Sequence, residues 1–281
     1  MEALQAAFPL PIAVLAIVAA LGCAIGFYKL VYFMSVGYGI AVALLSISMM
    51  VMSFTPLMPS MGWQGFILCA LLIVYGCRLS GFLIYREAKS ASFKKRFDKI
   101  YDKKQEKKVP FFVLFTIWIS VIVLYVCEVS PIFYRTMNEQ YEGTANIVLP
   151  LLGAAIMVFA LILESTADHQ KSAAKKVNPK RFVDTGLYRY VRCPNYLGEI
   201  LFWTGVFVSG CNCLNGWAQW VVAVFGYLCL VYVMLSGAKR LEKRQNKSYG
   251  EDIEYQAYVK KTPILFRLIP VKSIINWKWI V

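Results

Sequence analysis

Seven stretches of the chain are apolar and long enough to cross the roughly 30 Å hydrocarbon core of a bilayer as helices. They cover residues 7–27, 31–54, 63–85, 110–134, 147–165, 196–214 and 217–236. Hydrophobic residues make up 59% of the chain, a share that excludes an ordinary soluble domain. We therefore predict an all-α membrane protein with a single seven-span domain over residues 1–281.

Lys and Arg are concentrated in alternate segments between these spans. Ten of the thirty lie in 86–109, seven in 166–195 and ten in 237–281, whereas 135–146 holds only Arg135. Short loops rich in Lys and Arg stay on the cytoplasmic side of a membrane. The N-terminus is therefore expected outside and the C-terminus in the cytoplasm, in the inner membrane if the source is bacterial.

The formal net charge of +14 fits the same setting. Basic loops beside membrane spans follow from topology and anionic lipids, and no segment resembles a nucleic-acid-binding module. We therefore expect membrane lipids as partners and no nucleic acid. The basic cluster at 93–108 is expected to anchor the chain at the inner leaflet rather than to form a specific site. No Cys/His cluster has zinc-ligand spacing, so no metal is expected.

Four ionisable side chains fall inside the predicted spans, namely Arg78, Glu128, Glu164 and Glu199. A charge at membrane depth is costly unless it is paired or hydrated, so each is a candidate site residue. Arg78, Glu164 and Glu199 lie toward the cytoplasmic ends of their spans. Glu128 lies near the outer end of the fourth span, where we expect a solvated interfacial carboxylate rather than a buried acid.

The run GLYRYVRCPNYLGEILFW, residues 186–203, places many polar side chains directly before the sixth span. Gly186 and Pro194 are expected to interrupt any helix across this boundary. The arginines can bind phosphate oxygens, Asn195 offers both a donor and an acceptor, and the tyrosines can stack on flat rings. From the residues alone, an interfacial belt of aromatic and basic side chains remains the alternative.

The same run resembles the signature of the membrane steroid 5α-reductase family and its bacterial relatives of unassigned substrate. Asp168 in DHQK, Arg181, and the runs AKRLEKR and YQAYVKKTPILFRLIP are similar to further parts of that family's pattern. The resemblance covers about residues 160–270, which we expect to form the cofactor-binding half. One departure is Cys193, which stands where the family has His, and we expect it to be tolerated.

This resemblance implies NADPH as the cofactor, held at the cytoplasmic mouth of the spans. Asn195 and Glu199 lie four residues apart, on one face of a helix, and are expected to hold the nicotinamide end. The expected cofactor-binding residues are Arg78, Asp168, Lys175, Arg181, Arg192, Asn195, Tyr196, Glu199, Arg240 and Arg244.

A short element in the first half of the chain, YGCRLSGF at 75–82, is similar to the Tyr-x-x-Arg of the reductases' third span. In that family the Tyr reaches the substrate carbonyl and the Arg the cofactor, so Tyr75 is the candidate catalytic hydrogen-bond donor. The characterised steroid reductases pair this Tyr with a Glu of the second span, whereas residues 31–54 contain no acid. Glu128 is the candidate catalytic partner; otherwise Tyr75 acts with water, or the substrate is not a 3-oxo steroid.

The resemblance implies an NADPH-dependent oxidoreductase that acts on CH–CH groups and opens to the cytoplasm. It would reduce the conjugated C=C bond of a lipophilic enone, with 5α-reduction of a 3-oxo-4-ene steroid as one case. We expect a monomer. The main alternative is an S-adenosylmethionine-dependent membrane methyltransferase of the isoprenylcysteine or phospholipid type, because LEKRQNKSYGEDIEYQAYVKKTP is compatible with both families. A non-enzymatic lipid-binding protein would leave the cytoplasmic Arg, Asn and Glu cluster unexplained.

Overall fold

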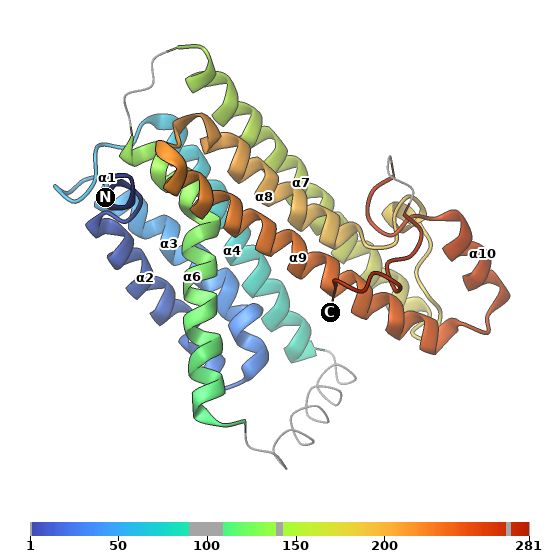
Figure 1. Cartoon of the computed structure of the whole chain (residues 1–281). Helices are drawn as coiled ribbons and strands as arrows, with labels where there is room; N and C mark the ends of the chain where they lie inside the picture. Colours follow the sequence, from blue (N-terminus) through green and yellow to red (C-terminus); the bar gives the residue numbers. More distant parts are fainter. Residues whose placement is uncertain (1, 90–108, 139–142, 268–270, 281) are drawn as a thin grey trace. The chain divides into compact units, whose positions relative to one another are not determined.

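The computed structural model describes residues 2–89, 109–138, 143–267 and 271–280 (Figure 1). The basic cluster at 93–108 lies outside these residues. The described residues form α-helices joined by turns and short 3₁₀ segments. The α-helices are α1 (Glu2–Ala7), α2 (Leu10–Cys23), α3 (Val36–Met52), α4 (Trp63–Lys89), α6 (Phe111–Met137), α7 (Ala145–Val177), α8 (Pro194–Gly210), α9 (Gly216–Tyr249) and α10 (Ile253–Lys261).

Five helical segments are long and apolar enough to cross a membrane: Leu4–Phe27, α4, α6, α7 and α9. The first of these runs through α1, α2 and the 3₁₀ turn Ala24–Phe27. The helices α3 and α8, which match two further predicted spans, have 17 residues each and are shorter than a typical span of about 20. The prediction of an all-α fold is confirmed, and the chain is a helical multi-pass membrane protein.

Two helices continue well past the predicted ends of their spans. The helix α7 runs to Val177 and α9 to Tyr249, whereas the apolar stretches end near 165 and 236. The added turns are rich in Ala, Lys, Glu, Arg and Gln, which favour helix without needing an apolar environment. Several predicted cofactor-binding residues, among them Asp168 and Arg240, therefore lie on helical extensions rather than on loops.

The chain divides into two compact units, and the first comprises residues 1–154 and 206–226. In this unit α2, α3, α4 and α6 pack side by side (Figure 1). The backbones of α3 and α4 approach closely at two glycines: a Cβ on Gly76 would lie 2.3 Å from the carbonyl oxygen of Gly39. One turn further along α4, Ser80 Oγ donates to the carbonyl of Val36 at 2.8 Å. This contact fixes the face of α4 that carries Tyr75 against α3.

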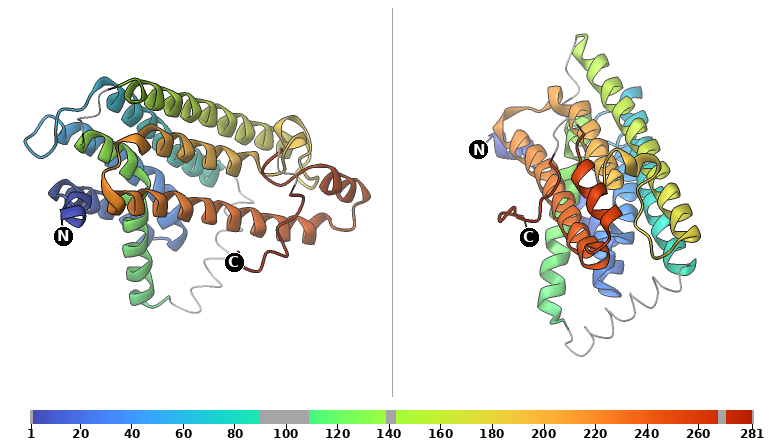
Figure 2. Two further views of the ribbon diagram at one scale, coloured as in Figure 1. Left: turned by 45° about the horizontal axis from the view of Figure 1, so that its top comes forward. Right: turned by 90° about the vertical axis from the view of Figure 1, so that its right-hand side faces the viewer.

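The second unit comprises residues 155–205 and 227–281. Its core joins α8 and α9 to the C-terminal segment through Cys193, Ile200, Ala238, Leu241, Ile264, Leu265 and Ile274. The C-terminal segment runs back beside α9 (Figure 2), where Lys239 Nζ donates to the carbonyls of Trp277 at 2.9 Å and Ile280 at 2.6 Å. The tail is thus an integral part of this unit.

Gly186 opens the signature run with a backbone that favours glycine. Its φ is +61°, and a Cβ there would lie 2.3 Å from Oε1 of Gln170. The same oxygen accepts the backbone N–H of Leu187 at 2.8 Å, which ties the turn to α7. A larger residue at 186 would therefore disturb both the turn and its attachment.

Candidate functional site

A hydrogen-bonded trio joins three parts of the second unit. The Tyr188 hydroxyl donates to Oδ1 of Asn195 at 2.6 Å, and Nδ2 of Asn195 donates to Oδ1 of Asp168. Tyr188 lies in the 3₁₀ turn Gly186–Arg189, Asn195 in the first turn of α8 and Asp168 on α7. The structure therefore brings together two of the predicted cofactor-binding residues, Asp168 and Asn195. Tyr188 was expected only as a stacking ring, and its role as a hydrogen-bond donor was missed.

The Tyr188 phenol is held in its neutral form. Burial raises its pKa, and the nearby Asp168 carboxylate raises it further. The Tyr188 carbonyl in turn accepts the hydroxyl of Tyr258 at 2.6 Å. Because the protonated Tyr188 hydroxyl donates to Oδ1 of Asn195, the Asn195 amide has one fixed orientation, with its Nδ2 toward Asp168.

Arg192 lies in the interior of the second unit rather than at a surface. It is 2% exposed, and its Nη2 donates to Oε1 of Glu242 at 2.7 Å and to the carbonyl of Lys272. The second oxygen of Glu242 accepts the backbone N–H of Ile274 at 3.1 Å. Nε and Nη1 of Arg192 are buried and make no hydrogen bond within the described residues. Arg192 thus fastens the signature to α9 and the tail, with two donors to spare.

Cys193 is packed in the same core. The residue is 4% exposed, and its backbone N–H donates to the carbonyl of Ile264 at 2.9 Å. Burial raises the pKa of its thiol to about 12, so it is a neutral packing group at physiological pH.

Two predicted phosphate ligands are engaged with protein groups. Lys175 Nζ donates to the Tyr249 hydroxyl at 3.0 Å and to the carbonyls of Pro179 and Arg181. Arg181 forms ion pairs with Asp184 at 2.9 Å and with Glu254. Because Arg181 is exposed, these pairs are screened by water and easily exchanged for another anion.

Two cations of α9 have no such partners within the described residues. Arg240 and Arg244 are exposed on α9 and make no hydrogen bond or ion pair there. A cleft of about 480 Å³ lies between the signature turn and the end of α10, and it brings Arg189 and Lys261 together. Its lining consists of Asp184, Thr185, Gly186, Arg189, Ala257, Tyr258, Lys261 and Thr262.

The remaining signature residues lie in the first turns of α8. Asn195 and Glu199 share this helix, as predicted, but they contact different groups. Glu199 is 5% exposed and accepts from Nε1 of Trp203 at 3.2 Å. Tyr196 is half-buried against the core, beside Gly237. Glu164, also buried, lies against Gly198, whose Cβ position is 3.1 Å from the Glu164 Cβ.

Tyr75 belongs to a buried group of tyrosines in the first unit. It is fully buried on α4, and the ring of Tyr38 from α3 stands edge-on to it with centroids 6.2 Å apart. Tyr125 of α6 lies 4.8 Å from Tyr38. Arg78 is half-buried one turn further along α4. Sequence reasoning missed Tyr38 and Tyr125, since a lone tyrosine in an apolar span gives no signal of its partners.

The prediction that Glu128 is a solvated interfacial carboxylate is wrong. Glu128 is 4% exposed within α6. The cause is a close approach of α9, because a Cβ on Gly226 would lie 2.5 Å from the backbone carbon of Cys127 and 2.7 Å from the nitrogen of Glu128. Glu128 shares a face of α6 with Tyr125, three residues earlier.

The apolar helices and the buried polar clusters described above define a multi-pass helical membrane protein. Residues 23–262 match the model of a family described as "Protein of unknown function (DUF1295)", and the chain belongs to that family. No curated protein and no solved structure matches the chain.

Proposed function

We propose that this protein is an integral-membrane, NADPH-dependent reductase of a conjugated C=C bond in a lipidic enone, such as a 3-oxo-4-ene steroid. The observation that supports it best is the trio of Tyr188, Asn195 and Asp168, which joins the polar residues of the reductase-like signature in one hydrogen-bonded cluster. A belt of interfacial side chains would not require a half-buried amide whose oxygen and nitrogen are both hydrogen-bonded to side chains of the same unit.

The proposed topology has seven spans, formed by α2, α3, α4, α6, α7, α8 and α9. The N-terminus lies outside, and the C-terminus and the cofactor site face the cytoplasm. The basic extensions of α7 and α9 support this orientation, since they carry the Lys and Arg residues that are retained on the cytoplasmic side.

The donors of the second unit fit a phosphorylated dinucleotide. Arg240 and Arg244 are uncommitted within the described residues, and Arg181 can exchange its surface carboxylates for phosphate, while the buried Arg192 would position the signature through Glu242 and the tail. Asp168, Asn195, Tyr196 and Glu199 would hold the nicotinamide end, and Lys175 would complete the set in the second unit. Bound NADPH would supply a hydride to the β-carbon of the enone.

Tyr75 is the proposed donor to the substrate carbonyl. Its burial among Tyr38 and Tyr125 keeps the hydroxyl away from bulk water, where a single hydrogen bond to a developing enolate oxygen has a large effect. Glu128 is the proposed partner in proton transfer, and its burial supports this role better than the solvated position expected from sequence.

Cofactor binding tests this function directly. The full-length protein, purified in detergent, is titrated with NADPH, NADH and S-adenosylmethionine, and binding is followed by nicotinamide fluorescence and by mass spectrometry of the retained ligand. We expect NADPH to bind more tightly than NADH, without displacement by S-adenosylmethionine. Binding of S-adenosylmethionine without binding of NADPH would instead support the methyltransferase alternative.

A further inference from the structure

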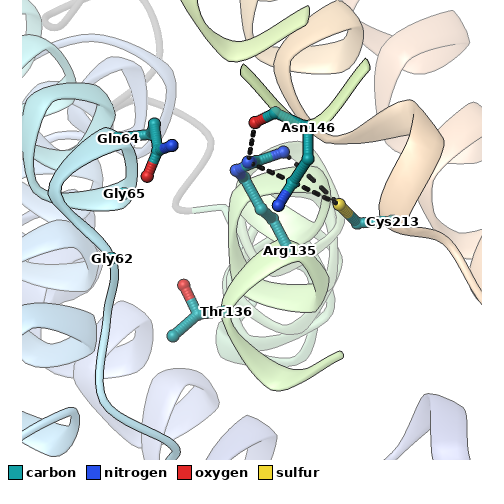
Figure 3. A pocket seen from close by; sticks show the side chains of 7 residues that line it. All are labelled: Gly62, Gln64, Gly65, Arg135, Thr136, Asn146 and Cys213. Carbon is teal, nitrogen blue, oxygen red and sulfur yellow. Dashed lines mark hydrogen bonds between the residues drawn. The ribbon is translucent and has the colours of Figure 1, made fainter. Parts of the chain in front are cut away.

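A polar cavity of about 130 Å³ lies in the first unit, between the start of α4 and the end of α6 (Figure 3). Gly62, Gln64, Gly65, Arg135, Thr136, Asn146 and Cys213 line it. None of these residues belongs to the proposed reductase site. The cavity is large enough for one small polyatomic ion and too small for a nucleotide.

Arg135 brings a buried positive charge to this cavity. The residue is 7% exposed, and its Nη2 donates to the carbonyl and side-chain oxygens of Asn146 at 2.7 and 2.5 Å. Its Nη1 donates to the carbonyl of Ser209 at 3.2 Å and to Sγ of Cys213 at 3.3 Å. Figure 3 shows the guanidinium between Asn146 and Cys213. All these acceptors are neutral, and within the described residues no carboxylate pairs with Arg135.

The start of α4 adds further positive character. This 27-residue helix begins at Trp63, and its first helical hydrogen bond runs from Phe66 N to the carbonyl of Gly62 at 3.2 Å. The N–H groups of Trp63, Gln64 and Gly65 therefore have no acceptor within the helix, and the positive end of its dipole faces the cavity lining. The half-buried Gln64 side chain makes no hydrogen bond within the described residues and can donate as well.

A buried guanidinium with only neutral partners is costly, and a nearby anion would remove most of that cost. We propose that this cavity binds one phosphate- or carboxylate-type oxyanion, held by the charge of Arg135, the Gln64 amide and the first N–H groups of α4. The ion can be free in solution or be the headgroup of a lipid. This site is independent of the proposed reductase activity.

The thermal unfolding of the full-length protein in detergent tests the proposal. Inorganic phosphate is added at constant ionic strength, with chloride as the balancing ion. The melting temperature of the wild type is expected to rise by several degrees and to saturate, because a ligand that binds only the folded state stabilises it. A matched titration with short-chain phosphatidic acid separates the sources: half-saturation at least tenfold lower indicates a lipid headgroup, and equal half-saturation indicates the free ion.

Two variants of Gln64 keep the test independent of whether Arg135 can be replaced without unfolding. Gln64→Glu places a carboxylate in the cavity, so it should raise the melting temperature without phosphate and abolish the phosphate response. Gln64→Leu should weaken half-saturation by about tenfold, the scale of one hydrogen bond to a charged group. Lys278→Gln removes an exposed charge of the other unit and should respond like the wild type.

Three results would overturn the proposal. The first is a wild type that phosphate and phosphatidic acid leave unchanged. The second is an equal response in Gln64→Glu and the wild type. The third is a response to phosphate that appears only in the double variant Glu139→Gln, Glu142→Gln. Such a result would mean that a glutamate of the chain itself neutralises Arg135 in the wild type. Both glutamates lie outside the described residues.

Discussion

Nδ2 of Asn195 donates to Oδ1 of Asp168, which joins the first turn of α8 to α7 across 27 positions of the sequence. The carboxylate fixes which way the amide faces, and the amide oxygen is then left to accept from Tyr188. The charge of Asp168 and the orientation of Asn195 are therefore coupled.

Asn195→Ala tests this coupling. The substitution removes an acceptor of the buried Tyr188 hydroxyl and a donor to Asp168, so we expect a loss of about 1–3 kcal/mol in the free energy of unfolding. NADPH binding should weaken together with turnover. The melting temperature and the dissociation constant are the measurements, with the exposed Asn276→Ala as the control. If Asn195→Ala keeps wild-type stability and activity, residues 186–203 are better explained as an interfacial belt of aromatic and basic side chains.

Arg240→Gln and Arg244→Gln test the two uncommitted cations of α9. Neither substitution breaks an interaction within the described residues, so folding should be unchanged. If one of these residues binds the 2′-phosphate, its loss should weaken NADPH binding about tenfold or more and leave NADH binding nearly unchanged. Equal losses for both cofactors would place these residues at the shared pyrophosphate, and no loss for either would remove them from the site.

Tyr75→Phe separates catalysis from packing. The change keeps the buried ring and removes only the hydroxyl, so cofactor binding should persist. Enone reduction should fall by about 10²–10³-fold, the scale of losing one oxyanion donor. Glu128→Gln should match this loss only if Glu128 is its partner, and Tyr38→Phe is the packing control. Reduction at the wild-type rate by Tyr75→Phe would exclude it as the donor to the carbonyl.

Cysteine accessibility tests the proposed orientation. Ser60→Cys, before α4, should react with an impermeant thiol reagent from outside intact cells, whereas Asn178→Cys, after α7, should react only after permeabilisation. Both positions are exposed, so a difference reflects sidedness rather than burial. Labelling of position 178 from outside would contradict a cytoplasmic location of the proposed cofactor site.

The Cys193 thiol should be inert in the folded protein. Its pKa is raised from 9.0 to about 12 by burial, so the thiolate is scarce at pH 8.5. In the unfolded chain the pKa of the Cys193 thiol is again 9.0. Above about pH 9 only the unfolded state releases this proton, so the stability of the folded state should fall as the pH rises. Alkylation followed by peptide mass spectrometry should modify Cys193 only in denaturant, with Asn178→Cys as the reactive control. Rapid native labelling would contradict its burial.

The helices and the composition of the signature could be predicted from sequence because both depend on local patterns. Hydropathy gave the approximate start of α4 and α6, but it could not give the ends of α7 and α9, where charged residues continue the helix. The family resemblance selected both Asp168 and Asn195 as cofactor-binding candidates, but the hydrogen bond between them was not predicted. The burial of Glu128 was not, because it depends on a close backbone approach at Gly226 that has no sequence signal.

Arg192 also shows why some predicted cations were difficult to assign. A positive residue in a signature suggests a ligand, but its actual contacts include Glu242, 50 residues away, and the tail. Long-range partners of this kind are a property of the folded chain, and they distinguish cations that organise a site from cations left available to a ligand.

The contact between Arg192 and the carbonyl of Lys272 spans 80 residues. A ribosome synthesises the signature first, and the tail that completes its surroundings emerges only near the end of translation. Arg192 therefore lacks its carbonyl partner of the tail until Lys272 has been synthesised. Premature termination before that point should leave a membrane-inserted chain whose second unit cannot complete its core, and quality-control proteases would be expected to remove it.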